Sequence, residues 1–537
     1  MFNAPIQLLN KDECLNLAKT TIDDLQLDLL YEDLLGEETQ PEVRNAWVSH
    51  YTTNTDFLKN SQLLLNHHNE DNEQQQKFLE IQKNYLEIKG NPSFREKYEY
   101  ITIDFFEKLN SSPHILQMIS MYSLTSPLLS LLTPFIMLII PFFILRVRGS
   151  SIGMGTYLAE LKKVLSMLPI GKLFTMGNSS LDQRGFILFS AILYIVQIYQ
   201  NSITCFKFYK NSHKMVRELH EFGEYMQNTA DRMREFIETC DNLELQKYTP
   251  FCDILREKIM YYETTSNEFL SIQANIFRDM GAKMKYYYDI YCNETFAENI
   301  EYSFCFHDYA NNLCQLSNIG FNSCTFSKKH TSFTKSYHGI LRNSNPIKNS
   351  FKLTDNNIIL SGPNASGKTT LLKSTVINII LSQQIGMGFF DKAKIKPYHS
   401  IHCYINIPDT CDRDSLFQAE ARRCREILSD ISKHPNKHHL CVFDELFSGT
   451  NPYEAVAGAV GYLEYLNKNK NVKFMLTTHY LDLCNHFEEK NTTIKNYTLE
   501  RKYVMAPGIS KIRGGIAVLE ELMFPEEILM TAKKWFR

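Results

Sequence analysis

Nine consecutive residues in the C-terminal half combine two glycines, a lysine and two threonines. They are Gly362, Pro363, Asn364, Ala365, Ser366, Gly367, Lys368, Thr369 and Thr370. In the pattern G-x-x-x-x-G-K-[ST], the glycines let backbone N–H groups curl around an anionic phosphate. The Lys368 ammonium would neutralise the β and γ phosphates, and the Thr369 hydroxyl would coordinate Mg²⁺. The spacing therefore predicts a nucleoside triphosphate site with a magnesium ion.

The residues on either side of this loop supply the elements that must position it. The apolar run 357–361 precedes the loop and predicts a buried strand, and the amphipathic run 371–377 follows it and predicts a helix. A helix that begins here points its partially positive N-terminus at the phosphates. An ordinary glycine-rich turn is the alternative, and the order strand, loop, helix disfavours it.

Two acidic residues end a second apolar run, 440–443. Asp444 is expected to reach the magnesium shell, and Glu445 to orient or deprotonate the water that attacks the γ-phosphate. A third apolar run, 474–478, ends in His479. In nucleotide-binding domains of the ABC type a histidine at this place hydrogen-bonds the γ-phosphate, although a lone histidine after a strand can also be structural.

Five short motifs between residues 340 and 537 resemble, in the same order, those of the MutS family of DNA mismatch-repair ATPases. Ser415, Phe417 and Glu420 occupy places in the family's S-T-F-x-x-E signature. Gly362-Pro363-Asn364 resembles the family's G-P-N, and Asp444-Glu445 with Gly449-Thr450 resembles its D-E-x-x-x-G-T. Thr478-His479-Tyr480 resembles the family's T-H-[YF], and the stretch from Gly508 to Ile528 resembles its closing motif. The L-S-G-G-Q signature of transporters is missing, which ranks a transporter subunit third among the functions considered.

The resemblance implies an α/β C-terminal ABC-type ATPase domain, of the P-loop NTPase class, preceded by a mainly α-helical lever and clamp region. ATP and Mg²⁺ are the implied cofactors, and residues 345–349 are expected to hold the adenine. In the family two ATPase domains pair head to tail, so Ser415 is expected to act in trans on the γ-phosphate of a homodimer. Duplex or branched DNA is the implied partner.

The chain departs from the bacterial mismatch binders in two respects. Phe222-Gly223-Glu224 spells their F-x-E wedge, but Phe222 falls in a helix with a heptad stripe and is expected to lie in a core. No mismatch-reading domain is therefore expected. The C-terminal helix-turn-helix of relatives is expected to be short or absent.

Two long uncharged runs, 124–145 and 186–206, are each long enough to cross a bilayer. The first contains Pro127, Pro134 and Pro141, which are expected to kink a spanning helix or fold it into a re-entrant hairpin. The alternative is a pair of hydrophobic helices buried in a large interface. Membrane association is the favoured reading of the two.

Composition limits the remaining function classes. The 537 residues carry a net charge of −3, so any DNA contact must come from a local basic patch. The 13 cysteines include no C-x-x-C and have no His-rich partner segment, so neither a disulfide framework nor a zinc site is expected. A reducing intracellular compartment is expected, since the N-terminus also lacks the pattern of a signal peptide.

Four regions are predicted along the chain. They are an N-terminal helical region (1–115), an apolar, membrane-like region with a basic connecting loop (116–206), a long-helix lever and clamp (207–300), and the MutS-like ATPase domain (301–537). Within the third region Leu219, Met226, Met233 and Cys240 form a heptad stripe that predicts core packing. Two functions stay open: a dimeric DNA-directed ATPase clamp, and a membrane-tethered mechanochemical ATPase that acts on a non-DNA partner.

Overall fold

The structure is a computed structural model of the 537-residue chain. It describes residues 2–67, 75–149, 153–167, 172, 181–272, 278–353, 356–405, 407, 415–490, 493–499, 503–510, 519–520 and 522–535. Residues 511–518 and 521 of the predicted closing motif lie outside the described residues.

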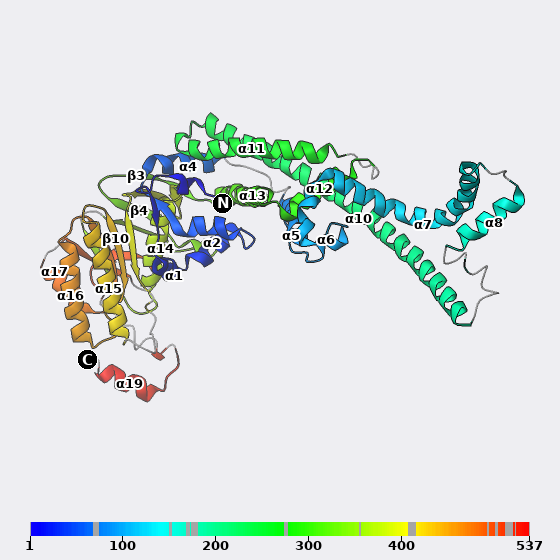
Figure 1. The fold of residues 1–537 in the computed structure, drawn as a ribbon. Helices are drawn as coiled ribbons and strands as arrows, with labels where there is room; N and C mark the ends of the chain where they lie inside the picture. The colour runs from blue at the N-terminus through cyan, green and yellow to red at the C-terminus, as the bar shows by residue number, and fades with distance from the viewer. Residues whose placement is uncertain are drawn as a thin grey trace. The chain divides into compact units, whose positions relative to one another are not determined.

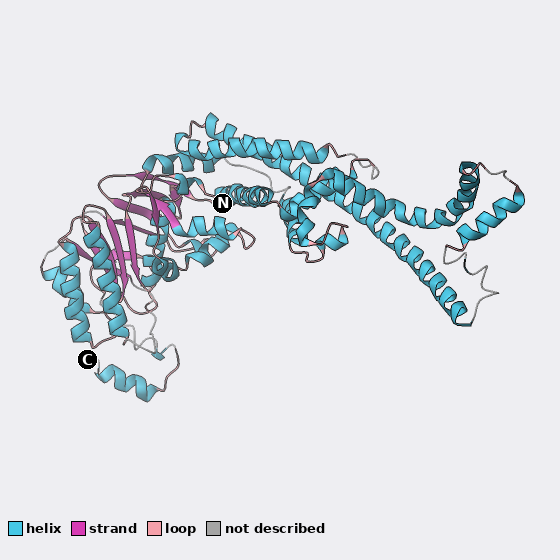
Figure 2. Cartoon of the chain, in the orientation of Figure 1, coloured by secondary structure: helices cyan, strands magenta, loops and turns pink. Residues whose placement is uncertain are grey.

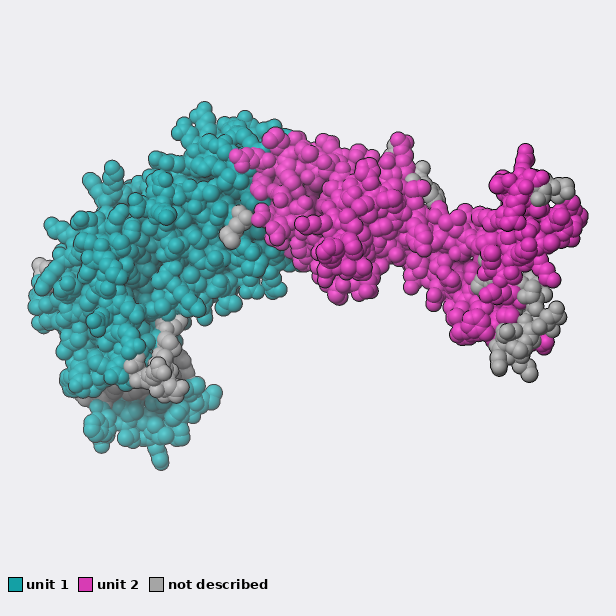
Figure 3. Space-filling model, viewed as in Figure 1, with its two compact units in different colours: residues 1–72, 234–256, 302–537 teal, residues 73–233, 257–301 magenta. Residues whose placement is uncertain are grey.

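The chain divides into two compact units (Figure 3). Unit 1 comprises Met1–Asn72, Arg234–Arg256 and Tyr302–Arg537, and unit 2 comprises Glu73–Met233 and Glu257–Glu301. Three long helices have residues in both units: α10 (Leu181–Asn242), α11 (Thr249–Leu270) and α13 (Glu294–Asn318). The four predicted regions stay a prediction.

Unit 1 holds all of the described strands (Figure 2). Its N-terminal elements are η1 (Pro5–Leu8), β1 (Cys14–Asn16), α1 (Lys19–Leu25), α2 (Leu27–Leu35), α3 (Pro41–Ser49), β2 (His50–Thr52) and α4 (Thr55–His67). Its other elements are η5 (Gln246–Tyr248), β3 (Asn322–Phe326), β4 (Thr331–Ser336), η6 (Gly339–Leu341), β5 (Asn349–Leu353), β6 (Asn357–Ser361), α14 (Lys368–Ser382), β7 (Met387–Gly388), β8 (Lys392–Ile395), β9 (Ser400–Tyr404), α15 (Leu416–Lys433), β10 (His439–Asp444), α16 (Pro452–Asn467), β11 (Val472–Thr478), α17 (Leu481–Glu489), β12 (Ile494–Leu499), β13 (Met505–Pro507) and α19 (Glu526–Trp535). An α/β C-terminal part after a mainly helical region is thereby confirmed.

The largest sheet has six strands in the order β13-β12-β6-β11-β10-β9, and all neighbours pair in parallel except β12 and β13. Parallel strands are buried on both faces, which explains why β6, β10 and β11 are nearly continuous apolar runs. Because these strands are parallel, their carboxyl ends meet at one edge. A second sheet has five strands in the order β5-β4-β8-β3-β7.

Helices cover both faces of the six-stranded sheet. Alternate side chains of β10, Cys441 and Phe443, pack in one buried cluster with apolar residues of α15, α16 and α17. Helix α14 contacts β10 and β11 instead, and Figure 1 shows it on the opposite side of the sheet from α16 and α17. The core of unit 1 therefore lies between these layers.

The first helix of the chain covers the edge strand β9. On α1, the Thr21 hydroxyl donates to the Ile401 carbonyl at 3.3 Å. The Asp24 carboxylate accepts from the Ile405 backbone N–H at 3.1 Å and from Arg423 Nη2, on α15, at 3.3 Å. Since an uncovered edge strand can pair with another chain, α1 completes this side of the sheet.

Unit 2 is helical in its described residues. Besides its parts of α10, α11 and α13, it contains α5 (Gln75–Lys89), α6 (Phe94–Lys97), η3 (Asp104–Ser111), α7 (Pro113–Val147), α8 (Met154–Leu165) and α12 (Met280–Cys292). An aromatic cluster surrounds Phe94, whose ring stacks on Tyr291 with centroids 4.2 Å apart. The predicted heptad stripe on α10 is buried, from Leu219 to Cys240, which confirms that it packs in a core.

Helix α7 is one continuous helix through its three prolines, so the predicted alternative of a re-entrant hairpin is wrong. Two described helical stretches, Pro113–Thr133 and Arg184–Asn242, are long and apolar enough to cross a membrane by length and composition alone. Only 17% and 6% of their most apolar windows are buried, so most of this apolar surface is uncovered by the described chain.

The Asp24–Arg423 pair provides a test of how α1 is held. Its side chains are 3% and 14% exposed, so Asp24→Ala leaves a buried guanidinium without this partner. We expect the free energy of unfolding of unit 1 to fall by about 3 kcal/mol, measured by urea denaturation. Asp23→Ala, a change at an exposed neighbour on the same helix, is the matched control. Equal stability of the two variants would show that this contact does not hold α1.

Candidate functional site

The glycine loop lies between β6 and α14, as predicted. A Cβ added to Gly362 would lie 2.4 Å from the Leu499 carbonyl oxygen, so only glycine fits there. Gly367 is the N-cap of α14 and has φ +85°, a left-handed conformation that favours glycine. The two glycines thus let the chain turn closely from strand to helix.

Lys368 folds back over this loop. Its Nζ donates to the carbonyls of Gly362 and Pro363, both at 3.0 Å, and the residue is 6% exposed. Burial lowers the pKa of Lys368, while the charges of Glu445 and Asp444 oppose that shift. The ammonium therefore lies where the oxygens of a bound anion could replace two neutral carbonyl acceptors.

Asp444 is held by two hydroxyls from neighbouring elements. Thr369 Oγ1, in the first turn of α14, donates to Asp444 Oδ2 at 2.7 Å. Thr477 Oγ1 donates to the other oxygen, Oδ1, since the parallel register sets Asp444 opposite Thr477. A hydroxyl and a carboxylate side by side are the oxygen ligands that Mg²⁺ prefers.

Glu445 follows directly and has a left-handed backbone conformation, with φ 52°. Its N–H donates to the Thr477 carbonyl at 3.0 Å, and its Oε1 lies 3.4 Å from His479 Nδ1. Hydrogen bonding with His479 lowers the pKa of Glu445, burial opposes this, and the charges of His479 and Lys368 lower it further. The carboxylate is therefore ionised at neutral pH and able to accept a proton.

A cavity of about 580 Å³ opens beside these groups. One wall is the loop and the first turn of α14, from Asn364 to Leu371, together with Glu445. The facing wall includes Asn345, Pro346, Ile347 and Asn349 from the predicted adenine segment, and also Tyr337, His338, Leu341, Leu499 and Tyr503. Sequence reasoning missed this last group, because its members come from segments without a motif.

The residues around the cavity fit a triphosphate and a magnesium ion. Ser366 Oγ is buried and has no hydrogen-bond partner among the described residues, so it is free to donate to an added anion. A Cβ at Gly362 would lie 2.9 Å from this hydroxyl and would fill the space beside it. Thr369 and Asp444 offer the magnesium ligands.

The other predicted site residues lie in the glycine loop or contact Thr369 or Glu445, but Ser415 does neither. It is exposed and is the N-cap of α15, where its Oγ accepts from Gln418 N–H at 3.4 Å and its own N–H donates to Gln418 Oε1 at 3.0 Å. It does not line the cavity of its own chain. The N-terminus of α15 is thus open to solvent.

Glu420 joins α15 to the loop that follows the two acids. Its carboxylate, 2% exposed, accepts from the Ser448 N–H and hydroxyl at 3.0 Å and from the Gly449 N–H at 3.1 Å. A Cβ on Gly449 would lie 2.7 Å from Leu416 Cγ, so the loop and α15 are in close contact. Ser415 is thereby tied to the Asp444–Glu445 loop within one chain.

Comparison with known proteins finds similarity in the C-terminal part of the chain. Residues 358–537 match the family model of MutS domain V. The protein Endonuclease MutS2 of Staphylococcus aureus is 28% identical over 209 residues, which is 37% of this chain and 26% of that protein. Its Thermus thermophilus counterpart is 28% identical over 225 residues, or 40% of this chain and 29% of that protein.

A further Staphylococcus aureus Endonuclease MutS2, from strain JH9, is 31% identical over 153 residues, or 28% of this chain and 19% of that protein. The match therefore spans less than a third of the length of each of these three relatives. Residues 358–537, about a third of the chain, are therefore similar to domain V of MutS-family proteins.

Proposed function

We propose that this chain is a magnesium-dependent ATPase of the P-loop class. The observation that carries the proposal is the Thr369–Asp444 hydrogen bond of 2.7 Å, because it joins the loop helix to the end of β10 beside the cavity. ATP would lie against residues 362–370, with its adenine toward residues 345–349. Bound Mg²⁺, held by Thr369 and Asp444, would neutralise charge on the phosphates.

The other polar groups have separate roles in this proposal. Lys368 exchanges its two carbonyl partners for phosphate oxygens. Glu445 orients the attacking water and accepts its proton, a role that suits an ionised carboxylate. His479, 3.4 Å from that carboxylate, keeps Glu445 in place and donates toward the γ-phosphate.

Ser415 acts on a second copy of the chain in this proposal. Its exposed position at the N-terminus of α15 supports this, because a helix N-terminus attracts phosphate and Ser415 does not line the cavity of its own chain. The Glu420 contacts would relay a movement of α15 to the loop after Glu445. The working form would then be a homodimer that closes on ATP.

DNA is the proposed partner of this ATPase. Support comes from the relatives, which are Endonuclease MutS2 proteins. The ATP cycle would open and close the helical part of the chain on duplex or branched DNA. With a net charge of −3, the contacts would come from local lysine and arginine patches.

A second candidate function is a membrane-tethered ATPase that acts on a non-DNA partner. Helices α7 and α10 are joined by polar contacts within unit 2: the Tyr194 hydroxyl donates to the Ser130 carbonyl at 2.9 Å, and Asn201 Nδ2 donates to Ser130 Oγ at 3.1 Å. Around these contacts the outward residues are apolar, such as Phe135 at 63% and Phe189 at 59% exposed. Small polar groups between helices and apolar groups outside suit a lipid environment.

Replacing the proposed base gives the first test of the ATPase. We expect Glu445→Gln to lower the turnover of ATP by roughly 100-fold or more, because the variant lacks the proton acceptor, and to leave ATP binding intact. Turnover is measured by phosphate release and binding by equilibrium titration. Glu489→Gln, at an exposed carboxylate on α17, is the matched control. Normal turnover in Glu445→Gln would exclude Glu445 as the base.

Lys368→Ala distinguishes binding from chemistry in the same assays. Loss of a charge-assisted contact that contributes about 1.5–3 kcal/mol should weaken ATP binding by at least roughly tenfold. Unchanged affinity would mean that the triphosphate lies elsewhere.

Fractionation followed by an ATPase assay separates the two candidate functions. If DNA is the partner, duplex DNA stimulates ATP turnover, and the stimulation falls as salt rises from about 50 to 200 mM. If the second function holds, the full-length protein sediments with membranes, only detergent releases it, and DNA has no effect on turnover. Absence of DNA stimulation at low salt would contradict the DNA proposal whatever the fraction in which the protein is found.

A further inference from the structure

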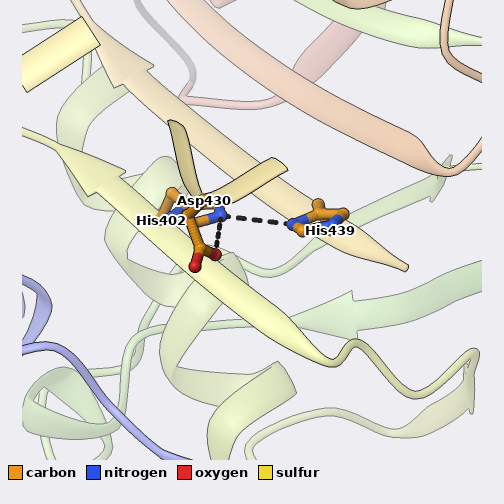
Figure 4. A group of neighbouring side chains, drawn as sticks. All are labelled: His402, Asp430 and His439. Atoms are coloured by element: carbon orange, nitrogen blue, oxygen red, sulfur yellow. Dashed lines mark hydrogen bonds and ion pairs between the residues drawn. The ribbon is translucent and has the colours of Figure 1, made fainter. Parts of the chain in front are cut away.

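Three side chains from three elements of unit 1 converge far from the glycine loop (Figure 4). They are His402 on β9, Asp430 on α15 and His439 on β10, and their ligand atoms all lie within 4.8 Å of one another. Strand register brings the imidazoles together: His402 pairs with Cys441, two residues after His439, so both rings lie on the same face of the sheet. That face is the one α15 covers.

The two separations among these atoms are long for hydrogen bonds. His402 Nε2 lies 3.4 Å from His439 Nδ1 and 3.4 Å from Asp430 Oδ2. Good N–H···O bonds are about 2.7–3.2 Å long. A tetrahedral ion with ligands at about 2.0–2.1 Å places those ligands about 3.3–3.4 Å from one another. Both observed separations match an edge of that tetrahedron.

The hydrogen bond of His439 with a backbone carbonyl leaves its Nδ1 available as a metal ligand. Its Nε2 lies 2.9 Å from the His434 carbonyl oxygen, which can only accept, so Nε2 carries the hydrogen. The lone pair of Nδ1 is then directed toward His402. Metal-bound histidines almost always donate their other N–H in this way to a carbonyl, carboxylate or water.

The surroundings leave room for a fourth ligand. His439 is fully buried, while His402 and Asp430 line a cavity of about 480 Å³. Arg423 also lines this cavity, and its guanidinium is paired with Asp24 at 3.3 Å. A water molecule in the cavity could therefore complete the coordination of an ion held by the three side chains.

We propose that His402 Nε2, His439 Nδ1 and the Asp430 carboxylate bind one divalent transition-metal ion of the zinc class, with water as the fourth ligand. Two imidazoles favour such an ion over Mg²⁺ or Ca²⁺, which take oxygen ligands. The site is separate from the proposed ATP site, since His439 begins β10 and Asp444 ends it, roughly 17 Å away at about 3.3 Å per residue.

The ion would tie the C-terminal half of α15 to the sheet. Asp430 lies near the end of this helix and Ser415 at its beginning, so a bound ion would fix the helix that presents Ser415. The role is structural, because the ion stabilises the folded chain that binds it. The proposal does not depend on ATP hydrolysis or on DNA binding.

Zinc titration of the full-length protein tests the proposal. Protein stripped with a chelator is titrated with Zn²⁺ alone, without nucleotide, by calorimetry, and bound zinc is counted by elemental analysis. We expect the unchanged protein to bind one more equivalent than Asp430→Asn, His402→Ala or His439→Ala. His438→Ala, which removes the neighbouring imidazole on the opposite face of the chain, should keep that equivalent. Background binding to exposed thiols such as Cys292 is the same in all variants and cancels in the difference.

Thermal unfolding gives the second readout and guards against misfolded variants. Zn²⁺ should raise the melting temperature of the unchanged protein by a few degrees and leave that of Asp430→Asn unchanged. Asp430→Asn nearly preserves volume, and circular dichroism checks its fold before titration. If a histidine variant fails to fold, the zinc stoichiometry of Asp430→Asn is sufficient to test the proposal. The proposal is overturned if the unchanged protein and a folded Asp430→Asn variant bind the same number of zinc ions. It is also overturned if His438→Ala is the one variant that loses a bound zinc ion.

Discussion

The Asp444 carboxylate accepts hydrogen bonds from two hydroxyls, Thr369 on α14 and Thr477 on β11, and the candidate site depends on this arrangement. The arrangement has three requirements. The parallel register must set Asp444 opposite Thr477, the glycine loop must follow β6, which is the neighbour of β11, and α14 must begin at Lys368. The register belongs to the buried sheet, and the loop and the helix follow directly after its strand β6. The positions of these polar groups therefore depend on the packing of the apolar core.

Helix α15 connects this site to the rest of unit 1. Along one helix, Ser415 caps the exposed N-terminus, Glu420 binds the loop after Glu445, Arg423 binds Asp24 of α1, and Asp430 faces His402 and His439. The contacts of Glu420, Arg423 and Asp430 are polar, at least partly buried, and made with residues of other elements. A change in the position of α15 would thus alter the edge of the sheet and the acidic loop together.

Much of the site could be predicted from sequence because its signals are local. The loop 362–370 and the apolar runs before Asp444 and His479 are each contiguous, and the heptad stripe from Leu219 is set by helical periodicity. Long-range pairing has no such signal: Asp24 meets Arg423 across 399 residues, and His402 meets His439 only through the register of β9 and β10. The wall formed by Tyr337 and Tyr503 was missed for the same reason. Of the two alternatives predicted from the prolines of α7, the re-entrant hairpin is wrong, since a helix can continue through prolines where neighbouring groups tolerate the lost hydrogen bonds.

A structure determined with a non-hydrolysable ATP analogue and Mg²⁺ tests the central claim most directly. The account predicts the triphosphate against residues 362–370, with the ion coordinated by Thr369 Oγ1 and by Asp444, directly or through water. A triphosphate bound outside the 580 Å³ cavity, or an ion remote from both Thr369 and Asp444, would contradict it.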